Sequence, residues 1–251
     1  QINNMGLLEA DSVPRRTMVL FFIVDASTSM EGNKIGAVND AIRNVLPMIH
    51  EISNDNPEAE IKVAVLQFAN GATWLYDKPL LADDFIWQDI VADGLTPMGE
   101  ALTELNKKLA KDEFMKSASG SYAPAFILMS DGQPTDNYEH GLNVLLKNKW
   151  FTSGIRTAIA IGADADRDIL AQFTGNSEGV YEVNNIEALK NVIRLIAVTS
   201  STIGSQASNS SKKKQDQVIE EVKKQIEDDE SGIQKGTNSD GSTDSEDDDW
   251  A

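Results

Sequence analysis

The stretch that decides the fold is residues 19–31, VLFFIVDASTSME. Its first six residues form a continuous apolar block rich in β-branched and aromatic side chains, which is typical of a strand buried on both faces of a parallel sheet. The block ends in Asp25-x-Ser27-x-Ser29, which places one carboxylate and two hydroxyls just beyond the strand. In open α/β sheets, ligands bind in the crevice outside the carboxyl ends of the strands. The stretch therefore predicts a central strand with an oxygen-rich site at its end.

Strand-like and helical patterns alternate along the chain on both sides of this block. The predicted strands are 17–25, 61–69, 124–130, 155–162 and 179–183, and the predicted helices are 35–53, 96–115, 136–150, 166–173 and 186–198. Asn70-Gly71 is a strong two-residue hairpin signal, so 73–76 should be an antiparallel edge strand. The alternation predicts an α/β fold, a doubly wound and mostly parallel central sheet flanked by helices, with one antiparallel edge strand.

Three local signals concern the helices. Pro47 lies inside the first helical pattern and should kink it, because its ring clashes with a carbonyl one turn back. Thr96 followed by Pro97 is a favoured helix start, with Thr96 as the N-cap residue. Asp136 is expected to cap the next helix, with Glu139 as its reciprocal partner.

Composition limits the classes of function. The chain has 251 residues and a net charge of −18, which argues against nucleic acid or an anionic membrane surface as a partner. It has no cysteine, which excludes a disulfide framework, a thiolate metal site and a cysteine nucleophile. No apolar run approaches the roughly 20 residues of a membrane helix, and the start has no signal-peptide pattern. These features together predict a cytoplasmic protein.

The chain divides into three parts. Residues 1–16 are expected to be a flexible lead-in, and residues 17–199 to be the folded domain. Residues 200–251 carry 6 basic and 13 acidic side chains and few apolar ones, which predicts an acidic, largely disordered tail. Within it, apolar residues spaced four apart indicate a possible helix over 212–230.

Five oxygen-bearing side chains follow the predicted strand ends or open a predicted helix. Asp25, Ser27 and Ser29 follow the first strand, Thr96 opens a helix, and Asp131 ends the strand 124–130. Each has an ordinary explanation as a polar loop or turn, but their order and placement should bring them together at one edge of the sheet. All five offer oxygen, which selects Mg²⁺, Mn²⁺ or Ca²⁺ over Zn²⁺ or Cu²⁺. Hydroxyl ligands on a compact octahedral ion that keeps several waters favour Mg²⁺.

This combination resembles the von Willebrand factor A (VWA) domain and its metal-ion-dependent adhesion site (MIDAS), and all five positions of the site are present. The resemblance implies that Ser27 and Ser29 bind the ion directly and that Thr96 binds it directly or through water. It also implies that Asp25 and Asp131 act largely through water and hydrogen bonds. The implied function is metal-dependent protein binding without catalysis, in which a partner's carboxylate completes the metal shell.

Two loops are similar to those of bacterial intracellular members of the family, the TerY-like proteins of tellurium-resistance and stress operons. They are residues 95–99, LTPMG, and residues 129–136, MSDGQPTD. The resemblance implies a Ser/Thr kinase and a metal-dependent Ser/Thr phosphatase as partners. Those proteins often carry a Cys-rich zinc module, which a chain without cysteine does not have.

Two other functions are compatible with the pattern. A metal-dependent hydrolase or phosphatase would also use a metal ion and two aspartates. Against it, no general base is predicted near the cluster, since His50 and His140 both fall on helices, and no phosphate-binding loop or nucleophile elbow occurs. The third possibility is a VWA subunit that works with an AAA-type ATPase. Met30, Glu31 and residues 133–137 are expected to line the rim of the site.

Overall fold

The ordered body of the protein extends from just before the first strand to the last helix. The computed structural model describes residues 14–110, 112–115, 119–207 and 213–236. Most of the expected lead-in, and the part of the expected tail from residue 237 on, lie outside these ranges. The last residues of the predicted lead-in are held by contacts, because the Arg15 guanidinium donates to the carbonyls of Ser53 and Ala59.

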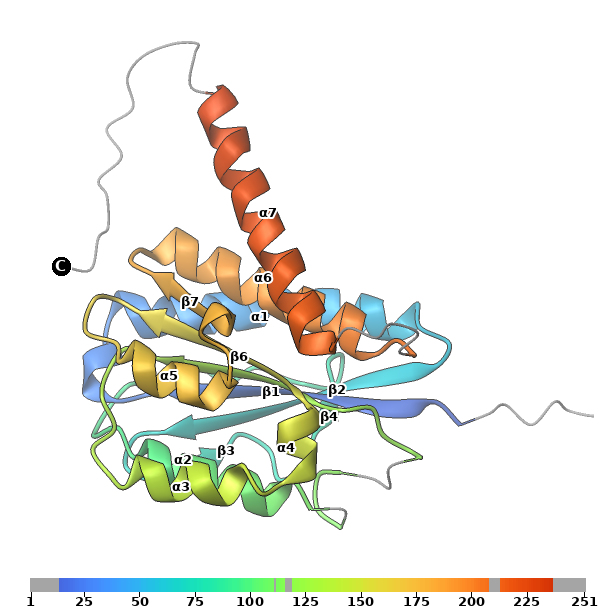
Figure 1. Cartoon of the computed structure of the whole chain (residues 1–251), viewed down its shortest axis with the longest axis horizontal. Coiled ribbons are helices and arrows are strands. Elements are labelled where there is room, and N and C mark those ends of the chain that lie inside the picture. The colour runs from blue at the N-terminus through green and yellow to red at the C-terminus, as the bar shows by residue number, and fades with distance from the viewer. Residues whose placement is uncertain (1–13, 111, 116–118, 208–212, 237–251) are drawn as a thin grey trace, which may run out of the picture.

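A seven-stranded sheet forms the centre of the molecule (Figure 1). Its order is β3-β2-β1-β5-β6-β7, with β4 pairing to β2 beside β3. The strands are β1 Arg16–Asp25, β2 Ala59–Phe68, β3 Ala72–Trp74, β4 Leu80–Leu81, β5 Ala125–Ser130, β6 Ile155–Ile161 and β7 Val180–Val183. All pairs are parallel except those of β3 and β4 with β2. The predicted fold class is confirmed, and the structure adds the two-residue strand β4.

Helices cover both faces of this sheet (Figure 1). One face is covered by α1 Asn33–Asn54 and α6 Ile186–Gly204. Helix α7 Lys214–Gly236 packs on α6 and β6 at its start and then extends away from the sheet. The other face is covered by α2 Met98–Lys108, α3 Tyr138–Leu145, α4 Lys149–Ser153 and α5 Arg167–Thr174. Short 3₁₀ turns, η1 Thr28–Met30 and η2 Ser177–Gly179, follow β1 and precede β7.

Strand β1 is buried on both faces, as its apolar block predicts. Alternate side chains pack under α1 and α6, and the intervening ones pack under α2 and α3. The first set is Met18, Leu20, Phe22 and Val24, and the second is Val19, Phe21 and Ile23. Each is at most 1% exposed, and full burial of such a side chain is worth about 1.5–3 kcal/mol. This packing fixes where β1 ends and therefore where Asp25 lies.

The two strands that pair with β1 lie on opposite sides of it. Strand β2 pairs on one side of β1, and β5, reached later, pairs on the other side, with Val24 opposite Met129. The order of the strands therefore reverses between β1 and β5. Ligands of open α/β sheets bind at such a switch point, beyond the carboxyl ends of the strands. Asp25 ends β1 and Asp131 follows β5 at this point.

Three of the predicted helices have clearly different limits in the structure. Helix α6 runs to Gly204, six residues beyond the predicted end at 198. The expected helix 136–150 is two helices, α3 and α4, because Asn148 interrupts it and its side chain accepts the N–H of Trp150 as a new N-cap. Helix α2 ends at Lys108 rather than near 115. Helix α1 runs through Pro47 as one element of 22 residues.

Helices α2 and α3 pack backbone against backbone at two glycines. A Cβ added to Gly141 would lie 2.3 Å from the Gly99 carbonyl oxygen, and one added to Gly99 would lie 2.5 Å from the Asn137 carbonyl oxygen. Such distances leave no room for any side chain, so the two helices approach as closely as their backbones allow. At the far end of the pair, the Asn148 amide donates to the side-chain oxygen of Asn106 at 3.1 Å.

Helix α7 overlaps the helix that the sequence predicts over 212–230. Val218, Ile219 and Val222 are at most 3% exposed where α7 packs on the body. At its start, the Lys214 ammonium donates to the carbonyls of Gly204 and Gln206, at 2.7 and 2.6 Å, which closes the end of α6. Burial lowers the pKa of Lys214 to about 8, and a nearby arginine charge adds to this effect.

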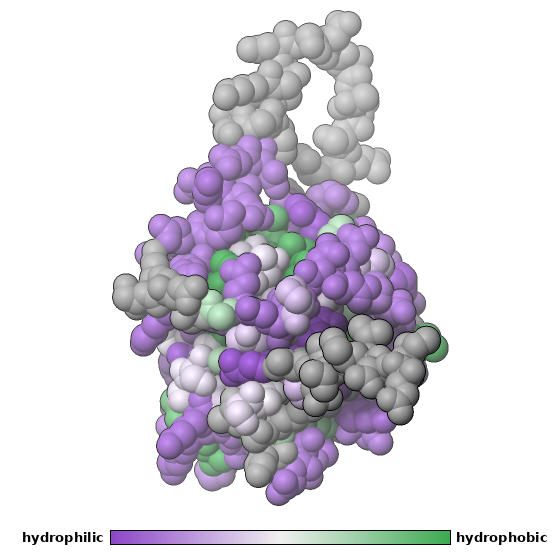
Figure 2. Space-filling model, turned by 90° about the vertical axis from the view of Figure 1, so that its right-hand side faces the viewer, coloured by the Kyte–Doolittle hydropathy of each residue, from purple (hydrophilic) through white to green (hydrophobic). Residues whose placement is uncertain are grey.

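The surface in Figure 2, on the right-hand side of the molecule in Figure 1, is mostly hydrophilic, with hydrophobic residues in small separate patches. None of the helices in the described part of the chain combines the length and the hydropathy of a membrane span.

Candidate metal site

Three loops meet at the carboxyl ends of β1 and β5. The segment before α2 is tied to the loop after β1, since the N–H of Asp93 donates to the Ala26 carbonyl at 2.8 Å and the N–H of Thr28 donates to Gly94 at 3.1 Å. Thr96 and Thr135 join the segment before α2 to the loop after β5 by two hydrogen bonds, of 2.9 and 3.1 Å. The backbone therefore holds all three loops in one arrangement.

Ser29 connects the first loop to the third. Its hydroxyl donates to Oδ1 of Asp131 at 2.7 Å, across 102 residues of sequence. The Oγ atoms of Ser27 and Ser29 are 3.0 Å apart. Because the single Ser29 proton goes to Asp131, Ser27 is the donor in this contact. The Ser29 oxygen thus turns its lone pairs away from the carboxylate.

Thr96 faces the same space from the second loop. A Cβ placed on Gly132 would lie 3.8 Å from Ser29 Oγ and 3.9 Å from Thr96 Oγ1. The two hydroxyls therefore flank one point beside Gly132. Thr96 is 6% exposed, so its hydroxyl is aimed into the site rather than into open solvent.

Asp25 lies beneath the hydroxyls and is fully buried. Its Oδ1 accepts the N–H of Ser27 at 2.9 Å, and its Oδ2 accepts the hydroxyl of Ser130 at 2.6 Å. Burial raises the pKa of the Asp25 carboxyl; the hydrogen bonds from Ser130 and Ser27 partly oppose this, and the charge of Asp131 adds to it. One oxygen of Asp25 thus positions the loop that carries Ser27, and the other bonds to the end of β5.

Lys34 is a member of this cluster that the sequence pattern does not single out. Its ammonium lies 2.7 Å from Oδ2 of Asp131. Ser130 is also absent from the predicted set, although it directly precedes Asp131 and only its position at the strand end could have indicated a role. The five predicted residues do come together, and Lys34 and Ser130 complete their hydrogen bonds.

The helix ends around the site differ from the prediction. Thr96 does not cap α2, which begins at Met98 without a side-chain cap from its own segment. Instead, the Asp136 carboxylate accepts the N–H groups of Gly99 and Glu100 at 2.8 and 2.7 Å. The cap of α3 is Asn137 rather than Asp136. The spacing of Asp136 and Glu139 predicts a local cap of α3. Spacing alone cannot reveal that the neighbouring helix α2 presents free N–H groups to Asp136.

One of the residues predicted to line the rim of the site does not do so. Met30 is 0% exposed and packs in the core under α1, so it cannot contact a ligand, whereas Glu31 is exposed. Leu95 and Val91, on the segment before α2, are 64% and 79% exposed.

The donor set fits a hard divalent ion. No group of three or more His, Cys, Asp or Glu side chains gathers within the described residues, so hydroxyls must supply part of any metal shell. Adjacent ligands of an octahedral ion at about 2.1 Å are about 3.0 Å apart. The Ser27 and Ser29 oxygens are 3.0 Å apart, which matches one edge of such an octahedron.

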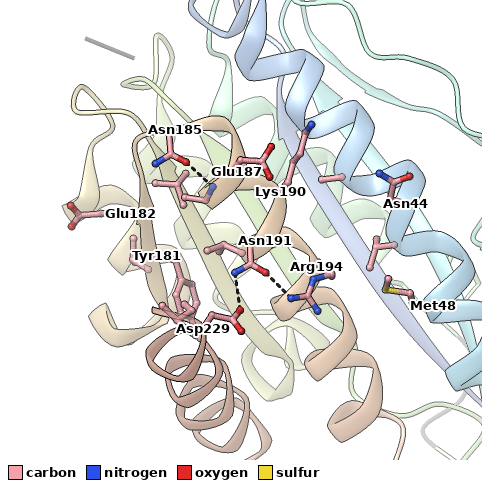
Figure 3. Close-up of a pocket in the computed structure, with 17 residues that line it drawn as sticks. Asn44, Met48, Tyr181, Glu182, Asn185, Glu187, Lys190, Asn191, Arg194 and Asp229 are labelled. Carbon is pink, nitrogen blue, oxygen red and sulfur yellow. Dashed lines mark hydrogen bonds between the residues drawn. The ribbon is translucent and has the colours of Figure 1, made fainter. Parts of the chain in front are cut away.

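A separate cavity of about 840 Å³ lies between α1, α6, β7 and α7 and contains none of the five residues. Asn191 crosses it, donating to Asp229 of α7 and accepting from Arg194 (Figure 3). Asn191, Asp229 and Arg194 bond to one another there, and the polar side chains that line the cavity do not converge on one point as the three hydroxyls do.

Comparison with known proteins identifies the fold independently. The family model for the von Willebrand factor type A domain matches residues 20–195. Among solved structures, a von Willebrand factor type A protein from Catenulispora acidiphila is 19% identical, with a TM-score of 0.56 and coverage of 74% of this chain and 43% of that one. A search of the curated proteins found no match.

Two further structures have the same fold. Proximal thread matrix protein 1 from the mussel byssus, with a zinc-occupied MIDAS motif, is 15% identical, with a TM-score of 0.57 and coverage of 75% and 49%. The pilus adhesin SpaC from Lactobacillus rhamnosus GG is 16% identical, with a TM-score of 0.58 and coverage of 75% and 30%. This chain spans less than half the length of each of these three proteins. The match over residues 20–195, together with the sheet order and its helical layers, makes the chain a member of the von Willebrand factor type A domain family.

Proposed function

We propose that this chain is a metal-dependent protein-binding module. A divalent cation, Mg²⁺ in preference to Mn²⁺ or Ca²⁺, is held by the hydroxyls of Ser27, Ser29 and Thr96. Asp25 and Asp131 orient those hydroxyls and act on the ion through water. The observation that carries the proposal is the pair of serine oxygens 3.0 Å apart, one of which donates its proton to Asp131 and so keeps a lone pair for a cation.

The ligand chemistry indicates the kind of partner. Hydroxyls are neutral, so an ion held directly by them keeps most of its positive charge and remains a strong acceptor for an anionic ligand. A carboxylate from a protein partner supplies that charge. Members of the family act as protein-interaction modules, and the structural relative SpaC is a pilus adhesin.

A non-enzymatic role is part of the proposal. His140 is exposed on α3, and the His50 ring pairs with Asn54 on α1, so neither supplies a general base to the cluster. The alternative is a metal-dependent hydrolase or phosphatase, which would show turnover of a phosphoester that Asp131→Ala abolishes.

The biological setting rests on the loop sequences at 95–99 and 129–136. They favour a TerY-like protein in a cytoplasmic bacterial stress-response, tellurium-resistance or signalling complex. Within it, a Ser/Thr kinase and a metal-dependent Ser/Thr phosphatase are the proposed partners. A VWA subunit that works with an AAA-type ATPase is the other setting that the pattern allows.

Calorimetry on EDTA-dialysed protein tests the metal site. We expect Mg²⁺ to bind, and Ser29→Ala to weaken its binding at least about tenfold. Ser153→Ala is the matched control, because it removes an exposed serine hydroxyl on α4, whose bond is to the Lys149 carbonyl. Titration with Zn²⁺ checks the choice of ion, given the zinc in the mussel protein. Absence of Mg²⁺ binding to the wild type would refute the proposal.

Capture of partners tests the binding role. Full-length protein on a resin should retain an acidic partner with Mg²⁺ and release it with EDTA, and Asp25→Ala should not retain it. Retention that neither EDTA nor Asp25→Ala changes would contradict metal-bridged binding.

A further inference from the structure

We infer that the Lys34 ammonium is a resident counter-ion of the metal site, which neutralises Asp131 in the metal-free protein and opposes the binding of a divalent ion. The inference rests on the proposed function and assigns a role to a residue outside the metal-binding set. Its consequence is a site that holds metal weakly alone and more tightly when an acidic partner supplies a further negative charge.

The contact between the two side chains is close and buried. Lys34 Nζ lies 2.7 Å from Asp131 Oδ2, and the two side chains are 21% and 0% exposed. The other oxygen, Oδ1, accepts the Ser29 hydroxyl. A buried carboxylate is costly without a positive partner, and in the metal-free protein Lys34 is that partner.

Lys34 lies where a helix does not favour a cation. It is the second residue of α1, and the first turn of a helix carries partial positive charge that favours acidic side chains. No acidic residue occupies that turn. The placement is therefore explained by the carboxylate that Lys34 reaches rather than by the helix that carries it.

Gly162 lies beside the ammonium of Lys34. A Cβ on Gly162, at the end of β6, would lie 3.7 Å from Lys34 Nζ and 3.9 Å from its Cε. Gly162 has φ +79, which side chains rarely adopt, and its N–H donates to the Val183 carbonyl at 2.8 Å. The lysine end thus lies at the ends of β5 and β6, beside Asp131 and Gly162.

The arrangement makes two cations share one carboxylate. An ion at the Ser29 hydroxyl and the ammonium of Lys34 both draw on Asp131, and like charges separated by a few ångströms in a buried site repel strongly. Lys34 therefore lowers the affinity for a divalent ion. A carboxylate from a partner adds negative charge beside both, so the binding of metal and partner is cooperative.

The test compares two lysine variants that change the net charge equally. Lys34→Gln removes the ammonium at the site, and Lys62→Gln removes one that is 28% exposed and pairs with Glu60 at 3.5 Å. Lys62 lies opposite Val19 in the sheet, about 20 Å along the strands from Asp25. The readouts are the Mg²⁺ and Mn²⁺ dissociation constants by calorimetry and the melting temperature in EDTA and in saturating Mg²⁺.

We expect Lys34→Gln to bind Mg²⁺ roughly tenfold more tightly than the wild type. It should also melt at a lower temperature in EDTA, and the deficit should largely disappear in saturating Mg²⁺. Lys62→Gln should bind Mg²⁺ like the wild type. Lys34→Arg, which keeps the charge, should bind more weakly than Lys34→Gln, and it gives a second comparison if Lys34→Gln is poorly folded.

Unchanged or weaker metal binding by Lys34→Gln would overturn the inference while leaving the metal site intact. Failure of the wild type and of every variant to bind either ion would overturn the proposed function as well. A melting deficit of Lys34→Gln that is equal with and without metal would show that Lys34 only supports the fold, and would also overturn the inference.

Discussion

Two regions of the molecule are stabilised in different ways. At the metal edge, buried carboxylates and hydroxyls bond to one another across three loops, and a lysine neutralises one of them. At the contact between α6 and α7, apolar side chains such as Val218 and Val222 are fully buried. The first region gathers buried carboxylate and hydroxyl oxygens that a divalent ion can bind, and the buried contact of the second is apolar. Stability of the first should therefore depend on metal, and stability of the second should not.

The polar pairs around α7 do not change this comparison. Lys223 with Glu178 and Asn191 with Asp229 are exposed pairs at 3.4 and 3.2 Å. Exposed pairs of this kind are worth about 0–1 kcal/mol. Burial of Val218, Ile219 and Val222 therefore holds α7 on the body.

The largest expected effect is that of Asp25→Asn on metal binding, and its absence would contradict the comparison between the two regions. Asp25→Asn keeps the size of the side chain but cannot accept from both Ser27 and Ser130. We expect the Mg²⁺ affinity to fall about 100-fold and the metal-dependent rise in melting temperature to vanish. Calorimetry and thermal unfolding with and without Mg²⁺ measure both effects. Wild-type Mg²⁺ affinity in Asp25→Asn would show that Asp25 is not part of the metal site.

A smaller effect is expected in the apolar region. Val222→Ala removes two buried methyl groups and should lower the free energy of unfolding by about 2 kcal/mol, whether or not Mg²⁺ is present. Val91→Ala, at a valine that is 79% exposed, is the control and should change it by less than about 0.5 kcal/mol. Urea denaturation checks this. A loss that Mg²⁺ restored would show that the two regions are energetically coupled.

The cap that joins α2 to the loop after β5 should give a smaller effect still. Asp136→Ala leaves the N–H groups of Gly99 and Glu100 without their carboxylate and should cost about 1 kcal/mol. Mg²⁺ affinity should fall a few-fold, because the same carboxylate fixes the segment that carries Thr96. Asp77→Ala, on the exposed segment between β3 and β4, should change neither quantity. Equal effects of the two variants would show that the cap does not support the site.

The last prediction concerns a pH dependence in the apolar region. The pKa of Lys214 is about 8 in the folded protein and 10.5 in an ordinary lysine. Between these values the unfolded chain binds more protons than the folded one, so this group makes the protein more stable as pH rises through that window. The free energy of unfolding of the wild type should therefore rise relative to Lys214→Met between pH 8 and 10, measured by urea denaturation in EDTA. A difference that stayed constant or fell would contradict the lowered pKa.

The sequence predicts those parts of the fold that local patterns encode. The apolar block before Asp25 is typical of a doubly buried strand, and the spacing of Asp25, Ser27 and Ser29 places three oxygens at its end. Joining them with Asp131 requires only that parallel strands end at one edge of the sheet, whereas Thr96 follows no parallel strand and joins the set through the resemblance to the VWA domain. The proximity of the strand-end residues follows from topology, which the alternation of strands and helices already predicts.

Features that depend on contacts between distant segments were not predictable in this way. Asp136 caps a helix that begins 38 residues earlier in the chain, at Met98, and Lys34 pairs with a residue 97 positions away. Met30 is buried in the core although its neighbours suggest an exposed loop. Asn148 divides a helical pattern whose apolar spacing continues on both sides. In each case a neighbour in space outweighs the local preference.

The contact between Gly99 and Gly141 has a mechanical consequence. Helices α2 and α3 touch backbone to backbone near one end and are joined at the other by Asn106 and Asn148, so they cannot slide or rotate independently. Thr96 precedes α2, and the loop that carries Asp131 leads into α3. We therefore expect α2 and α3 to move together, as one rigid pair, if either loop is displaced.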